Sequence, residues 1–144
     1  MKASELRIGN LINGIYYDYN IDDDHREKET ICEVVTLDSV GSCEYPIWVE
    51  SESNIETFSD FEPIPLTEEW LLKFGFEINR QTKEENNIWR CYSEEGFFEV
   101  EQIGSSFFLD DNHCYGTKIN HVHQLQNLYF ALTGEELTLK NQIQ

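Results

Sequence analysis

The sequence predicts an α+β protein: a small N-terminal antiparallel sheet, open or curled into a partly open barrel, then a helix, an antiparallel sheet and a C-terminal helix packed on that sheet. Three observations predict this arrangement. Short β-branched and aromatic segments recur between turn residues, a capped short helix lies near the middle, and an uncharged stretch with helical periodicity lies near the end. Hydrophobic residues form 40% of the 144 residues, which is enough to build a core.

The N-terminal part predicts several strands and one charged loop. The run NIDDDHREKE, residues 20–29, has almost no apolar residue and predicts a solvated loop. Asn13-Gly14 predicts either a tight hairpin or a bulge. The predicted strands are Leu11–Tyr19, Thr30–Leu37, Tyr45–Glu50 and Ile55–Phe58.

The segment Phe61–Pro65 predicts a boundary, because each of its two prolines pushes the preceding residue out of the helical region. We expect a β-rich N-terminal subdomain, residues 1–62, and a C-terminal subdomain with four or five strands between two helices, residues 63–144. Packing between the subdomains should make them one cooperative unit.

The run PLTEEWLLKFGF predicts a two-turn helix that begins at Thr67, its N-cap, and stops before Gly75. Leu66 and Leu71 have the spacing of a hydrophobic staple. Phe76 should fold back onto Leu71 after the helix ends.

Short strands should follow this helix. In FFEVEQI, Phe98 and Val100 should face the core while Glu99 and Glu101 face solvent. The predicted strands are Phe76–Arg80, Ile88–Tyr92, Phe97–Ile103, Ser106–Asp110 and Tyr115–Ile119.

Residues 119–134 contain no acid, lysine or arginine and predict a helix from about His121 to Thr133, with Asn120 as N-cap and Gly134 after its end. A helix on the surface of an acidic protein normally carries charges on its outer face. Because this helix has none, we expect it to be covered on two sides. The predicted apolar face is Val122, Leu125, Tyr129 and Leu132, and the predicted polar row is Asn120, Gln124, Asn127 and Ala131. We expect the N-terminal half, or a second copy of the chain, to cover the polar row.

Acidic residues dominate the charge of the protein. The chain has 28 acids against 10 bases, a net charge of -18, and residues 29–69 hold eleven acids without one Lys or Arg. Such a surface repels nucleic acid and anionic membranes and steers toward basic proteins, although acidity also serves solubility alone. The candidate interaction residues are Glu44, Trp48, Glu50, Glu52, Glu56, Asp60 and Glu62.

Nothing in the sequence indicates a membrane segment or a secretory signal. No run approaches the roughly 20 apolar residues of a membrane helix, and MKASELRIGN has no apolar region typical of a signal peptide. The four cysteines form no CxxC pair, which favours free thiols in a reducing compartment. We expect a cytoplasmic protein.

The weak metal candidates are His113, Cys114, His121 and His123. On a helix, however, His121 and His123 would point about 200° apart and could share an ion only if the chain before Val122 were extended. We expect no metal and no other cofactor. The sequence also lacks the phosphate-loop, dinucleotide, nucleophile-elbow and HExxH motifs, which favours a protein without enzymatic activity.

Three segments together, ELRIGNLI, FEPIPLTEEWLLKFGF and HVHQLQNLYFALTGEEL, resemble a family of small uncharacterised bacterial proteins. Members are often encoded in prophages and other mobile elements. The resemblance implies this genomic context and no activity, cofactor or catalytic residue.

The leading hypothesis is a non-enzymatic acidic accessory protein of a prophage or mobile element that binds a basic protein. One alternative is a nucleic-acid mimic that inhibits a host nuclease or repressor, with carboxylates spaced like phosphates. The other is a small enzyme whose site has no recognisable motif. A homo-oligomer formed through the C-terminal helix remains an expectation linked to its uncharged polar row.

Overall fold

The computed structural model describes residues 5–18, 26–37, 47–51, 58, 60–79, 86–94, 96–109 and 116–140. The chain divides into two compact units, Met1–Ile64 and Pro65–Gln144. Among the described residues, each unit contains one antiparallel sheet, and both helices belong to the second unit. The predicted α+β class is confirmed.

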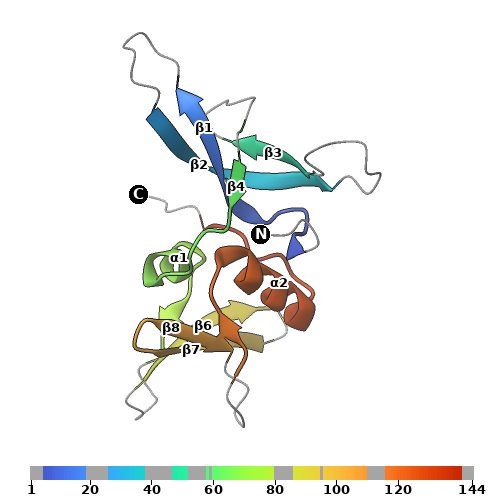
Figure 1. Ribbon diagram of the computed structural model, residues 1–144. Helices are drawn as coiled ribbons and strands as arrows, with labels where there is room; N and C mark the ends of the chain where they lie inside the picture. Colours follow the sequence, from blue (N-terminus) through green and yellow to red (C-terminus); the bar gives the residue numbers. More distant parts are fainter. Residues whose placement is uncertain are drawn as a thin grey trace. The chain divides into compact units, whose positions relative to one another are not determined.

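The first unit contains a four-stranded antiparallel sheet with the strand order β3-β2-β1-β4 (Figure 1). The strands are β1 (Leu11–Asp18), β2 (Arg26–Leu37), β3 (Ile47–Ser51) and β4 (Asp60–Glu62). The two outer strands pair only with their inner neighbours within the described residues, so the sheet is open and does not close into a barrel.

One face of this sheet carries the core of the first unit. Ile12 and Cys32 pair directly across β1 and β2, and directly paired residues point to the same face. The buried cluster is Leu6, Ile12, Cys32 and Val34, with Val49, Phe58 and Phe61 packed against it.

The predicted loop over residues 20–29 is wrong in its last part, because β2 already begins at Arg26. Glu27 and Lys28 pair with Tyr17 and Tyr16 of β1. A strand partner rich in aromatic residues therefore overrides the weak strand propensity of the charged run. Residues 20–25 lie outside the described residues.

The strand β4 was not predicted, because its sequence Asp-Phe-Glu lies next to a proline and has little strand propensity. It forms through pairing with β1 alone, at the sheet edge. Of the strand predicted at Ile55–Phe58, only Phe58 is described, and Phe58 belongs to no strand.

Gly14 makes neither a hairpin nor a bulge: it lies inside β1, in continuous register with Thr30. A Cβ atom placed on Gly14 would lie 2.5 Å from the Phe58 ring and 2.7 Å from the Cys32 Sγ. The glycine is therefore required because core side chains approach the backbone closely.

The second unit begins with α1 (Glu68–Lys73), whose N-cap is Thr67 as predicted. Its C-terminus closes with two backbone hydrogen bonds, Gly75 N–H to the Leu72 carbonyl and Phe76 N–H to the Leu71 carbonyl, both 2.9 Å. Gly75 has a φ of 82°, so the helix ends in the Schellman arrangement that the sequence predicts.

The five-stranded sheet of the second unit has the strand order β5-β6-β7-β8-β9 and is antiparallel throughout. All five strands occur within the predicted segments or one residue beyond them. Their bounds are β5 (Glu77–Ile78), β6 (Asn87–Ser93), β7 (Gly96–Ile103), β8 (Ser106–Leu109) and β9 (Lys118–Ile119).

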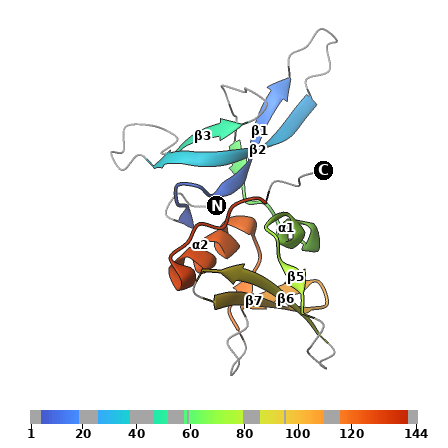
Figure 2. The same cartoon turned by 180° about the vertical axis from the view of Figure 1, so that it is seen from behind.

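Both helices lie over the same face of this sheet (Figures 1 and 2). Phe98 and Val100 are buried, as predicted, but Glu99 and Glu101 are half-buried and do not fully face solvent. The Glu99 side chain is only 13% exposed because it pairs with Arg90 across β6 and β7. The Phe98 ring lies 5.5 Å from the Tyr129 ring, between centroids, and thus joins the sheet to the second helix.

The helix α2 (Val122–Thr133) ends at Gly134, as predicted, but its N-cap is His121 and not Asn120. Gln124 causes this shift, since its Oε1 accepts hydrogen bonds from the backbone N–H groups of His121 (3.2 Å) and Asn120 (2.9 Å). These two donors would otherwise lack helical partners.

The set of α2 residues that are buried also differs from the prediction. Leu132 is 62% exposed, whereas His123 and Gln126 are buried beside Val122, Leu125 and Tyr129. Gln126 donates to the Leu137 carbonyl (3.3 Å), so the segment after the helix covers its second side. In the predicted polar row, Asn120 and Ala131 are exposed and Gln124 and Asn127 are half-buried.

Neither described helix is long and apolar enough to cross a membrane.

Replacing Gly14 by Ala should lower the free energy of unfolding by about 1 to 3 kcal/mol, because the new methyl group overpacks the core. Urea denaturation measures the change. The matched control is Gly96→Ala, where a Cβ meets nothing within 4 Å, and its effect should stay within about 0.5 kcal/mol. Equal effects of the two substitutions would show that the close approach to Gly14 does not constrain the fold.

Leu125→Ala should cost about 2 to 5 kcal/mol, because Leu125 is fully buried. Leu132→Ala on the same helix should cost less than about 0.5 kcal/mol, since the side chain is exposed. The two variants have the same change in helix propensity, so their difference in urea denaturation isolates burial. A comparable loss of unfolding free energy in both variants would contradict the burial of Leu125 and the exposure of Leu132.

Candidate functional site

The second face of the four-stranded sheet gathers six carboxylates. Strand pairing places Glu33 opposite Glu50, Glu29 opposite Ile15, and Ile15 opposite Asp60, so all of them share one face. All six side chains are exposed. We call this surface the acidic face, and its carboxylates are Glu27, Glu29, Glu33, Glu50, Asp60 and Glu62.

Apolar side chains occupy the middle of the acidic face. Leu11 and Ile15 of β1 lie on it and are buried, whereas Tyr17 is 43% and Ile31 is 41% exposed. Leu11, Ile15 and Tyr17 pair directly with Glu33, Glu29 and Glu27 of β2, and Ile15 also pairs with Asp60 of β4. Apolar and acidic side chains therefore lie side by side on the acidic face, and Tyr17 and Ile31 are the more exposed of these apolar residues.

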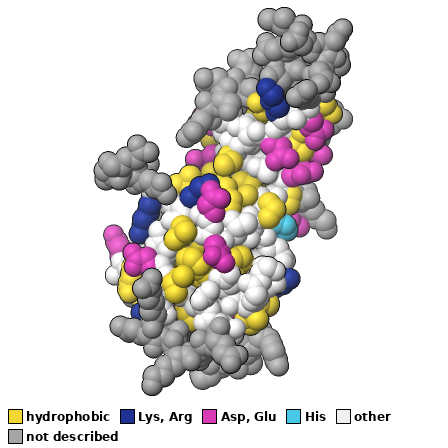
Figure 3. Space-filling view, turned by 90° about the vertical axis from the view of Figure 1, so that its left-hand side faces the viewer, with side chains coloured by type: hydrophobic (Ala, Val, Ile, Leu, Met, Phe, Trp, Pro, Cys, Tyr) yellow, Lys and Arg dark blue, Asp and Glu magenta, His cyan; other side chains and the backbone are white. Residues whose placement is uncertain are grey.

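The acidic face carries negative charges without basic residues beside them in the part of it that the structure describes. Within the described strands, no Lys or Arg occupies a position on it, and Lys28 belongs to the opposite face. Asn13 Nδ2 donates to Glu29 Oε2 over a long 3.4 Å. Figure 3 shows acidic side chains gathered beside hydrophobic ones over this sheet. The carboxylates thus repel one another and leave charge available to a partner.

Three of the predicted interaction residues lie on the acidic face, Glu50, Asp60 and Glu62. They occupy opposite edges of the sheet, on β3 and β4, and so do not form one ridge. Glu44, Glu52 and Glu56 and the side chain of Trp48 lie outside what the structure describes.

Glu27, Glu29 and Glu33 were missed as interaction residues. The first two fell in the predicted loop, and Glu33 lay in a strand whose partner was not known. The signal that identifies them is the alternation along residues 27–33, where every second residue is Glu, Glu, Ile and Glu.

His121 and His123 do not point apart, contrary to the helical geometry expected for them. His121 has extended backbone angles (φ -135°, ψ 154°) ahead of the helix, and the two rings stack at 5.7 Å between centroids and 6° between planes. His113 and Cys114 lie outside the described residues, within which no group of three or more His, Cys, Asp or Glu side chains is placed to hold a metal ion.

The described thiols are not activated as nucleophiles. Burial raises the pKa of the Cys32 thiol to about 11, despite a backbone hydrogen bond from Gly14. Burial also raises the pKa of Cys91 and raises that of its neighbour Tyr129 to about 12. Thiolate is the reactive form, so both cysteines are suited to packing and not to covalent catalysis.

Comparisons of the chain with protein-family models, curated proteins and solved structures gave no match.

Glu33→Lys should raise the free energy of unfolding by about 0.2 to 1 kcal/mol, because it converts a like-charge cross-strand pair with Glu50 into an opposite-charge pair. The effect should shrink at high salt. Glu94→Lys is the control: it changes net charge equally at an exposed turn residue of the second unit. If both variants stabilise equally in urea denaturation, only net charge is responsible and the Glu33–Glu50 pair contributes nothing.

Proposed function

We propose that the chain is a non-enzymatic accessory protein of a prophage or other mobile element, and that its acidic face binds a basic protein. The observation that carries the proposal is a sheet face on which six exposed carboxylates lie beside exposed apolar side chains, with no Lys or Arg on that face within the described strands. The resemblance of three chain segments to a prophage-associated family supports the genomic context.

The layout suits recognition of a protein. Protein interfaces combine apolar, partly aromatic contacts with polar ones, and Tyr17 and Ile31 supply exposed apolar area beside the carboxylates. The carboxylates supply long-range attraction, which accelerates encounter with a basic surface and fixes its orientation. Burial of Tyr17 and Ile31 by the partner would then limit dissociation.

The face is less suited to mimic nucleic acid. Residues 27–33 of β2 span about 20 Å at roughly 3.3 Å per residue and carry three carboxylates. A DNA duplex carries about one charge per 1.7 Å of axis, or roughly 12 over the same length. Ile31 also interrupts the row. A partner that contacts apolar as well as acidic side chains therefore fits this face better than a partner that recognises only the spacing of phosphates.

The test is affinity capture from a bacterial host lysate at about 50 mM and 500 mM salt, with mass spectrometry of retained proteins. The wild type should retain a basic protein at low salt and release it at high salt, since exposed charges are screened. Glu33→Lys/Glu50→Lys should lose that protein, and so should Tyr17→Ser, which removes apolar area at unchanged charge. The nucleic-acid mimic would be supported instead by a different result. In that case Glu33→Lys/Glu50→Lys would lose the captured protein, Tyr17→Ser would keep it, and duplex DNA would compete with it for binding.

The control for charge is Glu77→Lys/Glu94→Lys, which changes the net charge by the same amount in the second unit and should retain the partner. Loss of the partner in both double variants would mean that net charge alone holds it, and would contradict a site on the acidic face.

A further inference from the structure

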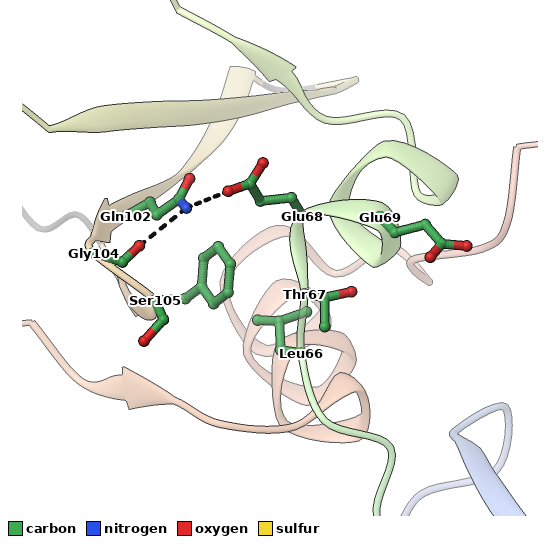
Figure 4. Close-up of a pocket in the computed structure, with 8 residues that line it drawn as sticks. Leu66, Thr67, Glu68, Glu69, Gln102, Gly104 and Ser105 are labelled. Carbon is green, nitrogen blue, oxygen red and sulfur yellow. Dashed lines mark hydrogen bonds between the residues drawn. The ribbon is translucent and has the colours of Figure 1, made fainter.

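A cavity of about 490 Å³, widely open to solvent, lies in the second unit, beside the start of α1. Its volume falls within the roughly 300–1,000 Å³ typical of small-ligand sites. The segment entering α1 and the turn between β7 and β8 line it (Figure 4). It shares no residue with the acidic face, so what it binds is independent of the function proposed for that face.

The apolar part of the lining consists of Leu66 and Phe107, both of them buried. The Leu66 backbone N–H donates to the Asn120 carbonyl (2.9 Å), which fixes the segment that enters α1. Phe107 lies in β8, where it pairs with Gln102 and Ile119 on either side. Both apolar residues are thus held by backbone pairing and form a rigid wall suited to a short hydrocarbon chain.

The polar part of the lining centres on Glu68, whose carboxylate is held in place by a buried amide. Gln102 Nε2 donates to Glu68 Oε1 (2.6 Å) and to the Gly104 carbonyl (3.1 Å), and Figure 4 shows both bonds. Gln102 Oε1 in turn accepts from Trp89 Nε1 at 2.7 Å. The amide therefore cannot rotate without breaking a buried hydrogen bond, and it holds Oε1 of the exposed Glu68 side chain through one short bond.

The remaining polar groups are compatible with a cation. The Gly104 carbonyl and the hydroxyls of Thr67 and Ser105 can all accept hydrogen bonds, and the lining has no Lys, Arg or His. The N-terminus of α1 would favour an anion, but its effect is equivalent to at most about half a charge. Glu69 is paired with Lys73 (2.8 Å), so Glu68 supplies a full negative charge that outweighs the helix.

The occupied oxygen of Glu68 decides which cation fits. A guanidinium binds a carboxylate best through two parallel hydrogen bonds, which need both oxygens. Here Oε1 already accepts from Gln102, and Oε2 has no hydrogen bond within the described part of the chain. One available oxygen plus nearby hydroxyl and carbonyl acceptors suits the three donors of an ammonium.

We propose that this cavity binds a protonated primary amine at the end of a short aliphatic chain, the chemistry of a lysine side chain. The ammonium donates to Glu68 Oε2 and to the neighbouring acceptors, and the chain packs against Leu66 and Phe107. The same chemistry is offered by a free alkylamine and by a lysine within a peptide.

The test is an NMR titration of the isotopically labelled full chain with n-butylamine hydrochloride and with Nα-acetyl-lysine N-methylamide. Both should cause saturable shifts in the backbone amide signals of Thr67, Glu68, Gly104 and Ser105, with millimolar affinity as expected of so small a ligand. Tighter binding of the lysine derivative would identify a peptide lysine as the ligand, and equal or weaker binding would identify a free amine. No saturable shift up to about 50 mM of either probe, far above that affinity, overturns the proposal.

Neutral probes and matched variants isolate the charge. n-Butanol and the Nε-acetylated lysine derivative should bind at least fivefold more weakly than their cationic counterparts. Glu68→Gln keeps an oxygen for Gln102 and should weaken amine binding at least fivefold, whereas Glu94→Gln, with the same loss of charge elsewhere, should leave it unchanged. Equal binding of butanol and butylamine, or no effect of Glu68→Gln, would show that no ammonium site exists.

Discussion

The pairing register of β1 with β2 is the constraint on which the first unit depends. Directly paired residues share a face, so the register that puts Cys32 and Val34 into the core also puts Glu29 and Glu33 into solvent. A slip by one residue would exchange the two sets, burying carboxylates and exposing the core. Core and acidic face are therefore two consequences of one register, and neither can form without the other.

Two local features hold that register. Just before the start of β1, Gly9 N–H donates to the Val34 carbonyl (2.8 Å), and Val34 N–H donates to the Asn10 carbonyl (2.9 Å). Asn10 is 1% exposed, and its side chain accepts from Arg7 N–H at 2.7 Å. At Gly14, only a residue without a side chain admits Phe58. A Cβ atom at position 14 would clash with that ring, so the glycine favours the observed pairing.

Prediction from sequence succeeded where a signal is local. The start and end of α1 follow from Thr67 and Gly75, which act within a few residues. It failed where a distant partner decides: β4 exists only through its pairing with β1, and Glu27 lies in a strand because Tyr17 faces it. The buried residues of α2 differ from the predicted ones because Gln126 is buried. Its side-chain amide donates to the carbonyl of Leu137, which lies eleven residues further along the chain. Composition predicted an acidic surface, but the residues that form the acidic face could be identified only from the strand pairing.

A net charge of -18 selects no ligand by itself, and two carboxylate environments in this chain show why position matters more than number. On the acidic face the carboxylates are exposed and repel one another, so they act over about one Debye length, 8 to 10 Å, and lose effect as salt rises. Glu33 and Glu50 lie directly opposite each other, and like charges in this arrangement are expected to weaken a sheet. Glu68 is also exposed, but the buried Gln102 amide holds one of its carboxylate oxygens beside Leu66 and Phe107. In the proposed complex, short-range hydrogen bonds and apolar contact would add to the effect of charge. Under the two proposals, the acidic face would bind a large cationic surface, whereas the cavity would select one cationic group.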